Sequence, residues 1–157
     1  MRKVYLLFTI VFAILSCNCQ KKTVENTAST KVTLTDQDKL PKLEYVANTR
    51  GFFQRITIED KMVTVYSDRN SDKGQSVQLS DADLKELTTA FQKIKLEDLA
   101  TFKDPTQKRF YDGAAIANLK VTNSKGKEFQ TVDFDHGFPP VEIEKLVNKI
   151  ASFGKKE

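Results

Sequence analysis

The sequence predicts one small α+β domain, with a mostly antiparallel sheet of four or five strands and two helices on one face. Three observations support this fold class. Segments that alternate apolar and polar residues come in pairs, each pair precedes a segment with helical spacing of its apolar residues, and 157 residues suit a single domain. The order strands, helix, strands, helix favours both helices on one side of the sheet. We expect this domain to occupy residues 42–157.

The first half of the domain is expected to consist of short strands followed by a helix. A polar turn at 59–61 separates two segments that each have one apolar face, so residues 52–67 predict a hairpin. Residues 43–47 and 76–79 are expected to add one strand before and one after this hairpin. The inward-facing residues of the hairpin are Phe52, Ile56, Ile58, Val63 and Val65.

A helix is predicted to begin directly after Ser80, whose hydroxyl group can cap the first turn. Asp81 and Asp83 suit the positive end of the helix dipole. The helix continues as one apolar stripe made of Leu84, Leu87, Phe91 and Ile94. Residues 96–99 predict a short helical turn that packs against it, and residues 103–112 predict a loop.

The second half of the domain repeats the plan of two strands and a helix. Residues 115–121 and 128–135 predict strands joined by a turn in which Gly126 takes a positive φ at low cost. In the second of these strands, Val132 and Phe134 are expected to face inward. The last helix is predicted to open at Pro139–Pro140 and to bury a face made of Val141, Ile143, Leu146, Val147 and Ile150.

The first sixteen residues are typical of a bacterial export signal. Arg2 and Lys3 precede the uncharged run 4–15, which is shorter than the ~20 residues that a helix needs to cross a bilayer. The residues up to Ser16 and Cys17 resemble a lipobox, which implies cleavage before Cys17 and attachment of lipid to its sulfur. We therefore expect a signal peptide over 1–16 and a lipidated Cys17 at the start of a polar, flexible tether over 17–41.

Other roles for the two cysteines are weaker. A disulfide between Cys17 and Cys19 would close a strained loop of negligible size. A metal site would need further ligands near this Cys-x-Cys pair, and no other Cys or His lies nearby. The predicted partner of this segment is therefore the lipid bilayer, which acylated Cys17 enters.

Net charge argues against a nucleic-acid partner. The formal charge of +4 falls to +2 when Arg2 and Lys3 are removed with the signal peptide. The remaining lysines are interleaved with Asp and Glu, as on an ordinary solvated surface. No nucleic acid and no cofactor are predicted.

Asp133, Asp135 and His136 form the most chemically suggestive cluster. The two carboxylates are expected on one face of their strand, beside the single histidine of the chain. Such groups can bind a metal or transfer protons. The alternative is structural, because Asp and His near a helix start also satisfy backbone N–H groups. We assign no metal and no catalytic residue from the sequence.

The predicted loop over 103–112 is a second candidate for binding. It carries basic and aromatic residues, namely Lys108, Arg109, Tyr111 and Asp112. Loops of this kind are common recognition sites, although this one is equally explained as a solvated connection. Residues 68–74 have spaced oxygen ligands, but the glycine is misplaced and Leu79 stands where a calcium loop needs Glu.

The start CNCQKK after a short signal, and the segments KRFYDGAAIANLKVTN and FDHGFPPVEIEKLVNKI, resemble the small lipoproteins of Bacteroidota. This resemblance implies a bacterial cell envelope, with the outer membrane favoured over the inner one, but no activity or site residues. We expect a non-enzymatic binding module for an envelope protein or a small ligand. Two alternatives stay open: a metal protein or hydrolase that uses Asp133, Asp135 and His136, and an inhibitor or immunity-type protein.

Overall fold

The computed structural model describes residues 40–155, so the predicted signal peptide, Cys17 and nearly all of the predicted tether lie outside the described residues. Within residues 40–155, no helix is long and apolar enough to span a bilayer. The domain is α+β, as predicted, with seven strands instead of four or five. Its elements are β1 (Lys42–Asn48), β2 (Phe53–Glu59), β3 (Met62–Tyr66), β4 (Gln75–Gln78), α1 (Asp81–Phe91), η1 (Leu96–Thr101), η2 (Lys108–Tyr111), β5 (Ile116–Thr122), β6 (Glu128–Gln130), β7 (Phe134–Asp135) and α2 (Glu144–Ser152).

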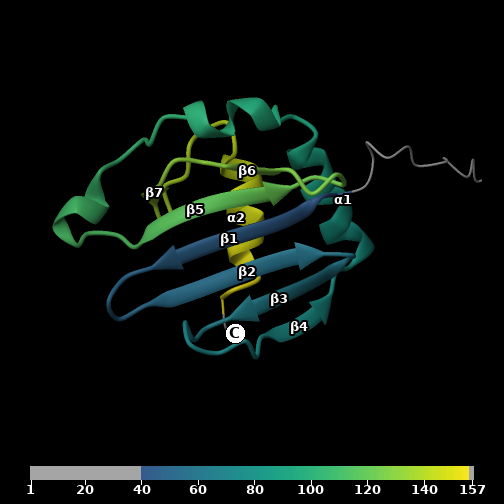
Figure 1. The fold of residues 1–157 in the computed structure, drawn as a ribbon, viewed down its shortest axis with the longest axis horizontal. Helices are drawn as coiled ribbons and strands as arrows, with labels where there is room; N and C mark the ends of the chain where they lie inside the picture. Colours follow the sequence, from purple (N-terminus) through teal and green to yellow (C-terminus); the bar gives the residue numbers. More distant parts are fainter. Residues whose placement is uncertain (1–39, 156–157) are drawn as a thin grey trace, which may run out of the picture. The chain divides into compact units, whose positions relative to one another are not determined.

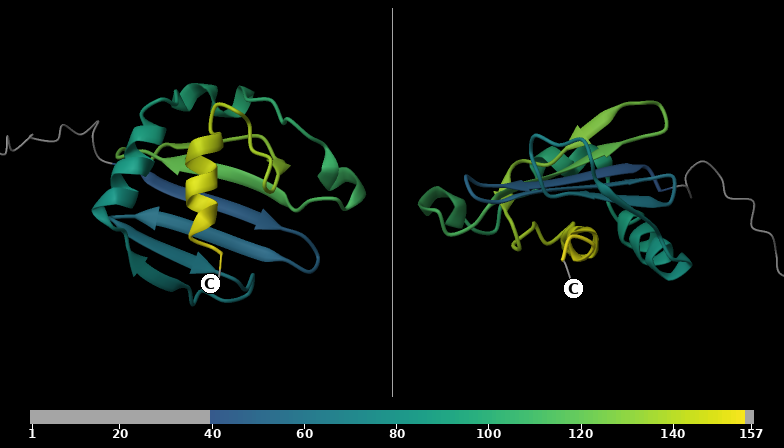
Figure 2. Two further views of the ribbon diagram at one scale, coloured as in Figure 1. Left: turned by 180° about the vertical axis from the view of Figure 1, so that it is seen from behind. Right: turned by 90° about the horizontal axis from the view of Figure 1, so that it is seen from below.

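The sheet has the strand order β4-β3-β2-β1-β5-β6, and β7 also pairs with β5 (Figure 1). Every pairing is antiparallel. Both helices lie on the same face of the sheet, which confirms the expected layering (Figure 2). Strand β1 lies at the centre with β5 beside it; buried and half-buried side chains alternate along β1 and along β5 after the exposed Ile116. Within residues 40–155, neither α1 nor α2 covers the other face of the sheet, as antiparallel sheets allow (Figure 2).

The core lies between the sheet and the two helices. Leu43, Tyr45 and Ala47 of β1 are fully buried, and so are Leu119 of β5 and Leu87 of α1. Ser80 caps α1 as predicted, because its hydroxyl oxygen accepts a hydrogen bond from the backbone N–H of Asp83 at 3.1 Å. The bare face of the sheet instead carries cross-strand ion pairs such as Glu44–Lys120 at 3.1 Å.

The predicted strand over 128–135 is interrupted by an extra residue. Val121 pairs with Phe129, a register that would place Asp133 opposite Ala117, but Phe134 stands there instead. Thr131 causes the break, because its hydroxyl oxygen accepts the N–H of Leu119 at 3.1 Å in place of a backbone carbonyl. Phe134 faces inward as predicted, whereas the same prediction was wrong for Val132, which is 42% exposed.

Two further predictions of buried residues were wrong at the ends of elements. Helix α2 begins at Glu144 and not at Pro139–Pro140, because residues 140–143 first form a turn closed by the N–H of Ile143 on the carbonyl of Pro140. Val141 lies in this turn and is 77% exposed. Phe52 precedes β2 in the β1–β2 turn, and it is 39% exposed.

Candidate functional site

The side chain of Asp135 holds the loop between η1 and β5 against the end of the sheet. Asp135 follows the extra residue of the β6–β7 segment and is completely buried. Its carboxylate accepts hydrogen bonds from the hydroxyl group of Thr106, from the backbone N–H groups of Lys108 (2.6 Å) and Arg109 (3.0 Å), and from the Arg109 guanidinium (3.1 Å). One carboxylate therefore fixes both the start of η2 and the segment before it.

Arg109 completes this arrangement from inside the loop. Its guanidinium lies between Asp135 and Asp104 and forms ion pairs with both. The hydrogen bond to Asp104 contributes most to raising the pKa of Arg109 above its usual value, and the bond to Asp135 adds to it. Desolvation of the guanidinium opposes both effects. Because its side chain is only 11% exposed and already paired, Arg109 is not free to bind an external anion.

The pKa of Asp135 reflects two opposed effects. Burial disfavours the charged carboxylate and by itself would raise the pKa. The hydrogen bonds from Thr106, Arg109 and Lys108 favour the charged form and outweigh burial, so that the pKa falls to about 2. Asp135 is therefore ionised at neutral pH, with both oxygens engaged by the loop.

At the tip of this loop, two aromatic side chains face solvent. Phe110 and Tyr111 are 72% and 71% exposed, although both belong to the short helix η2. The Arg109 guanidinium lies 4.5 Å from the centre of the Phe110 ring. Asp112 ends η2 in the left-handed conformation, with φ of 58°. We call Phe110 and Tyr111 the aromatic tip.

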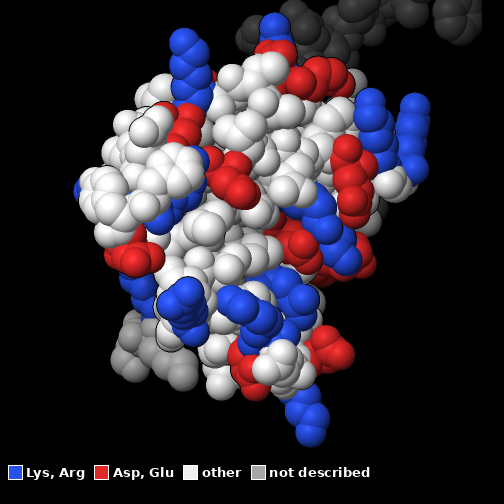
Figure 3. Space-filling model, turned by 60° about the vertical axis from the view of Figure 1, so that its left-hand side comes forward, with Lys and Arg blue, Asp and Glu red and all other residues white. Residues whose placement is uncertain are grey.

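The surface around this end of the sheet is partly apolar. The ammonium group of Lys108 lies 3.6 Å from the centre of the Phe138 ring, and Phe138 is 40% exposed. Figure 3 brings this end of the molecule forward and shows uncharged residues interspersed with carboxylates over its upper and central part, with several lysine and arginine side chains grouped lower down. Solvent-exposed aromatic groups beside cations are common in protein interfaces.

His136 lies on the opposite side of the strand from Asp135. Its Nδ1 is 2.7 Å from the hydroxyl oxygen of Tyr45, a core residue, and its ring centre is 5.4 Å from that of Phe52. Burial lowers the pKa of His136, so it is neutral at pH 7. Burial also raises the pKa of Tyr45, which is therefore a hydrogen-bonding phenol and not a phenolate.

The structure separates the three residues of the suggestive cluster. Asp133 and Asp135 lie on the same side of β5, since Asp133 bonds the side chain of Asn118 and Asp135 pairs with Ile116. Asp133, however, is exposed, Asp135 is covered by the loop, and His136 points toward the core. Among residues 40–155, no group of three or more His, Cys, Asp or Glu side chains could hold a metal ion.

Sequence reasoning identified the loop but not the residues that organise it. Lys108, Arg109 and Asp135 come together as a structural unit, while Tyr111 and Asp112 lie at its exposed end. Phe110 was missed, although two consecutive aromatic residues before an Asp-Gly turn are a detectable signal. No local pattern indicates the contacts of Thr106 with Asp135 or of Tyr45 with His136, because these partners lie far apart in the chain. Asp104 was missed although its partner Arg109 is only five residues away.

Comparison of this chain with models of protein families, with curated proteins and with solved structures finds no match.

Replacing Asp135 by Asn is expected to lower the free energy of unfolding by about 3 kcal/mol, because it leaves Arg109 and two backbone N–H groups facing a neutral amide. Chemical denaturation measures this loss. The matched control is Asp133→Asn at the exposed carboxylate, which should change stability by less than about 0.5 kcal/mol. Equal losses in the two variants would contradict the role assigned to Asp135.

Acid is expected to destabilise the domain through the same carboxylate. The folded pKa of about 2 lies below the ordinary value of about 3.9, so the stabilisation is complete above about pH 5 and is lost as the pH falls toward 2. Asp135 should contribute about 2 to 3 kcal/mol to this loss. The free energy of unfolding, measured by chemical denaturation at a series of pH values, should therefore fall more steeply between about pH 5 and about pH 2 for the native chain than for Asp135→Asn. Equal pH dependence of the two chains would contradict the assignment.

Proposed function

We propose that this chain is a lipid-anchored protein of the bacterial cell envelope, whose folded domain binds a protein partner through the aromatic tip. The observation that carries the proposal is the exposure of Phe110 and Tyr111 on a loop that a buried carboxylate holds in place. Exposed aromatic side chains lose contact with water when a partner covers them, and they dominate many interfaces.

The fixed geometry of the loop favours binding. A mobile loop would lose conformational entropy when a partner ordered it, whereas η2 is already held by the hydrogen bonds of Asp135. The Arg109 guanidinium, which Asp135 and Asp104 hold, lies against the Phe110 ring and gives it a favourable contact inside the loop. We expect the partner to present an apolar pocket for these two rings, with an acceptor near the Tyr111 hydroxyl group.

The anchor half of the proposal rests on the sequence. The basic start, the short apolar run and Ser16-Cys17 together indicate cleavage and lipidation. Two or three acyl chains on Cys17 would hold the protein stably on a membrane, where a single chain would not. An inhibitor or immunity-type role would use the same aromatic tip, and the identity of the partner would distinguish it from other binding roles.

Cys17→Ser is expected to abolish incorporation of radiolabelled palmitate and to release the protein from the membrane fraction, because the acyl acceptor is lost. The matched control is Cys19→Ser, which should keep both the label and the membrane association. Label that persists on the Cys17→Ser chain, or that disappears only in Cys19→Ser, would refute the anchor at this sulfur.

Truncation of both aromatic rings, as Phe110→Ala with Tyr111→Ala, should weaken partner binding by about tenfold or more. Crosslinking in intact envelopes followed by mass spectrometry identifies the partner, and its affinity is then measured with both purified proteins. The control is Val77→Ala with Val141→Ala, which trims two exposed apolar side chains elsewhere. An affinity that both double variants reduce equally, or that neither reduces, would exclude the aromatic tip as the binding surface.

A further inference from the structure

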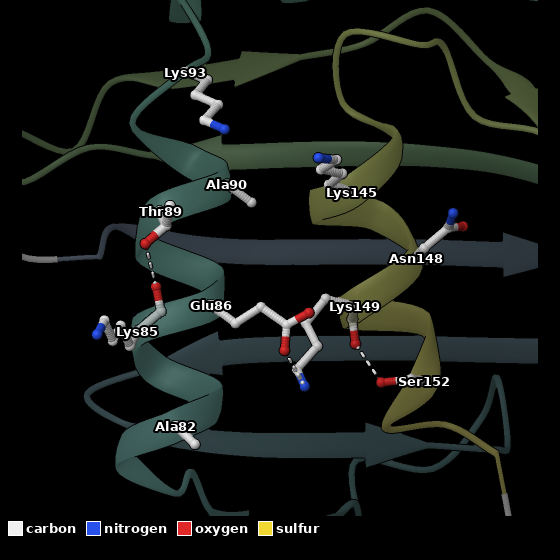
Figure 4. Close-up of a pocket in the computed structure, with 10 residues that line it drawn as sticks. All are labelled: Ala82, Lys85, Glu86, Thr89, Ala90, Lys93, Lys145, Asn148, Lys149 and Ser152. Atoms are coloured by element: carbon white, nitrogen blue, oxygen red, sulfur yellow. Dashed lines mark hydrogen bonds and ion pairs between the residues drawn. The ribbon is translucent and has the colours of Figure 1, made fainter.

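A groove between α1 and α2 carries an excess of lysine. It has a volume of about 950 Å³ and lies between the two helices (Figure 4). Four of the residues that line it are lysines, namely Lys85, Lys93, Lys145 and Lys149, and the only carboxylate among them is that of Glu86. The floor includes Ala82 and Ala90, so small side chains leave the groove wide.

The lysines divide into one that is paired and three that are not. The ammonium group of Lys149 lies 2.7 Å from a carboxylate oxygen of Asp83 and 2.7 Å from one of Glu86, so it ties the two helices together. Within residues 40–155, Lys85, Lys93 and Lys145 have no carboxylate partner. In Figure 4, Lys93, in the turn after α1, and Lys145 of α2 lie at the same end of the groove, away from the Glu86–Lys149 pair.

This end of the groove lies where the N-terminal segment joins the domain. Leu40 and Pro41 line a second pocket together with Phe91, Gln92 and Lys95, at the end of α1 that also carries Lys93. The second pocket contains lysines and carboxylates in equal number, so the unbalanced positive charge belongs to the groove. A chain anchored at Cys17 would thus enter the domain beside its unpaired lysines.

We propose that Lys93 and Lys145 bind the phosphate groups of anionic phospholipids and hold this end of the domain against the membrane surface. The inference rests on the proposed lipid anchor, because the anchor keeps the groove close to the headgroups and lets weak attraction suffice. Long lysine side chains suit this role, since their stems cover the apolar floor while their charges reach outward.

The test uses the lipidated full chain in vesicles of phosphatidylcholine, with and without one third phosphatidylglycerol. Amine acetylation read by mass spectrometry should slow about fivefold at Lys93 and Lys145 in the anionic vesicles, a protection that 0.5 M salt removes. Lys73 is the internal control, because it is exposed in the loop that follows β3, outside the groove. It should be acetylated at the same rate in the two kinds of vesicle. Equal acetylation of Lys93 and Lys145 in the two vesicles would overturn the inference.

Further arms separate the other outcomes. Protection by glycerophosphate alone, at the same phosphate concentration, would reassign the groove to soluble phosphates, and protection only in native envelopes would reassign it to an acidic protein. Co-flotation of the lipidated chain with phosphatidylcholine vesicles tests the anchor separately, because it does not depend on the charge of the groove. The Cys17→Ser chain, which lacks the proposed anchor, should still show protection at higher concentrations of anionic lipid, so failure of the anchor and failure of the groove give different results.

Discussion

The buried carboxylate of Asp135 is the interaction on which the functional end of this domain depends. Without it, the segment from Asp104 to Tyr111 would have few contacts with the sheet, because η2 has no buried residue of its own. The carboxylate compensates for its own desolvation by accepting hydrogen bonds from three residues of that segment. The exposed rings at the tip are held by a charge and not by an apolar core.

Local patterns were sufficient to predict most of the secondary structure. Alternation in β1 to β3, the cap at Ser80 and the apolar stripe of α1 each depend on neighbouring residues, and each was found from the sequence. The extra residue near Thr131 depends on a hydrogen bond to Leu119, and the burial of Asp135 depends on a loop more than 25 residues earlier. Such long-range pairings have no local signature. The sequence therefore indicated Asp133, Asp135 and His136 as candidates, but it could not show that the three side chains lie in different environments.

The two proposed surfaces lie at opposite ends of the central strand. Strand β1 starts at Lys42, next to the pocket that Leu40 shares with the end of α1, and finishes at Asn48, which pairs with Ile116 beside the loop of η2. Seven residues of strand extend over roughly 20 Å. A lysine groove beside the start of β1 and an aromatic tip beyond its end are thus far enough apart for a lipid surface and a protein partner to be bound at the same time.

The additional residue between Phe129 and Phe134 also has a consequence for the shape of that stretch of chain. Deleting a single position there would leave Phe134 opposite Ala117, now in a ladder without interruption along β5. An extra residue bends a strand and increases its twist, so the shortened chain would form one straight strand in place of β6 and β7. In any alignment of related chains, a gap between these two phenylalanines would thus mark a protein whose last strand is continuous.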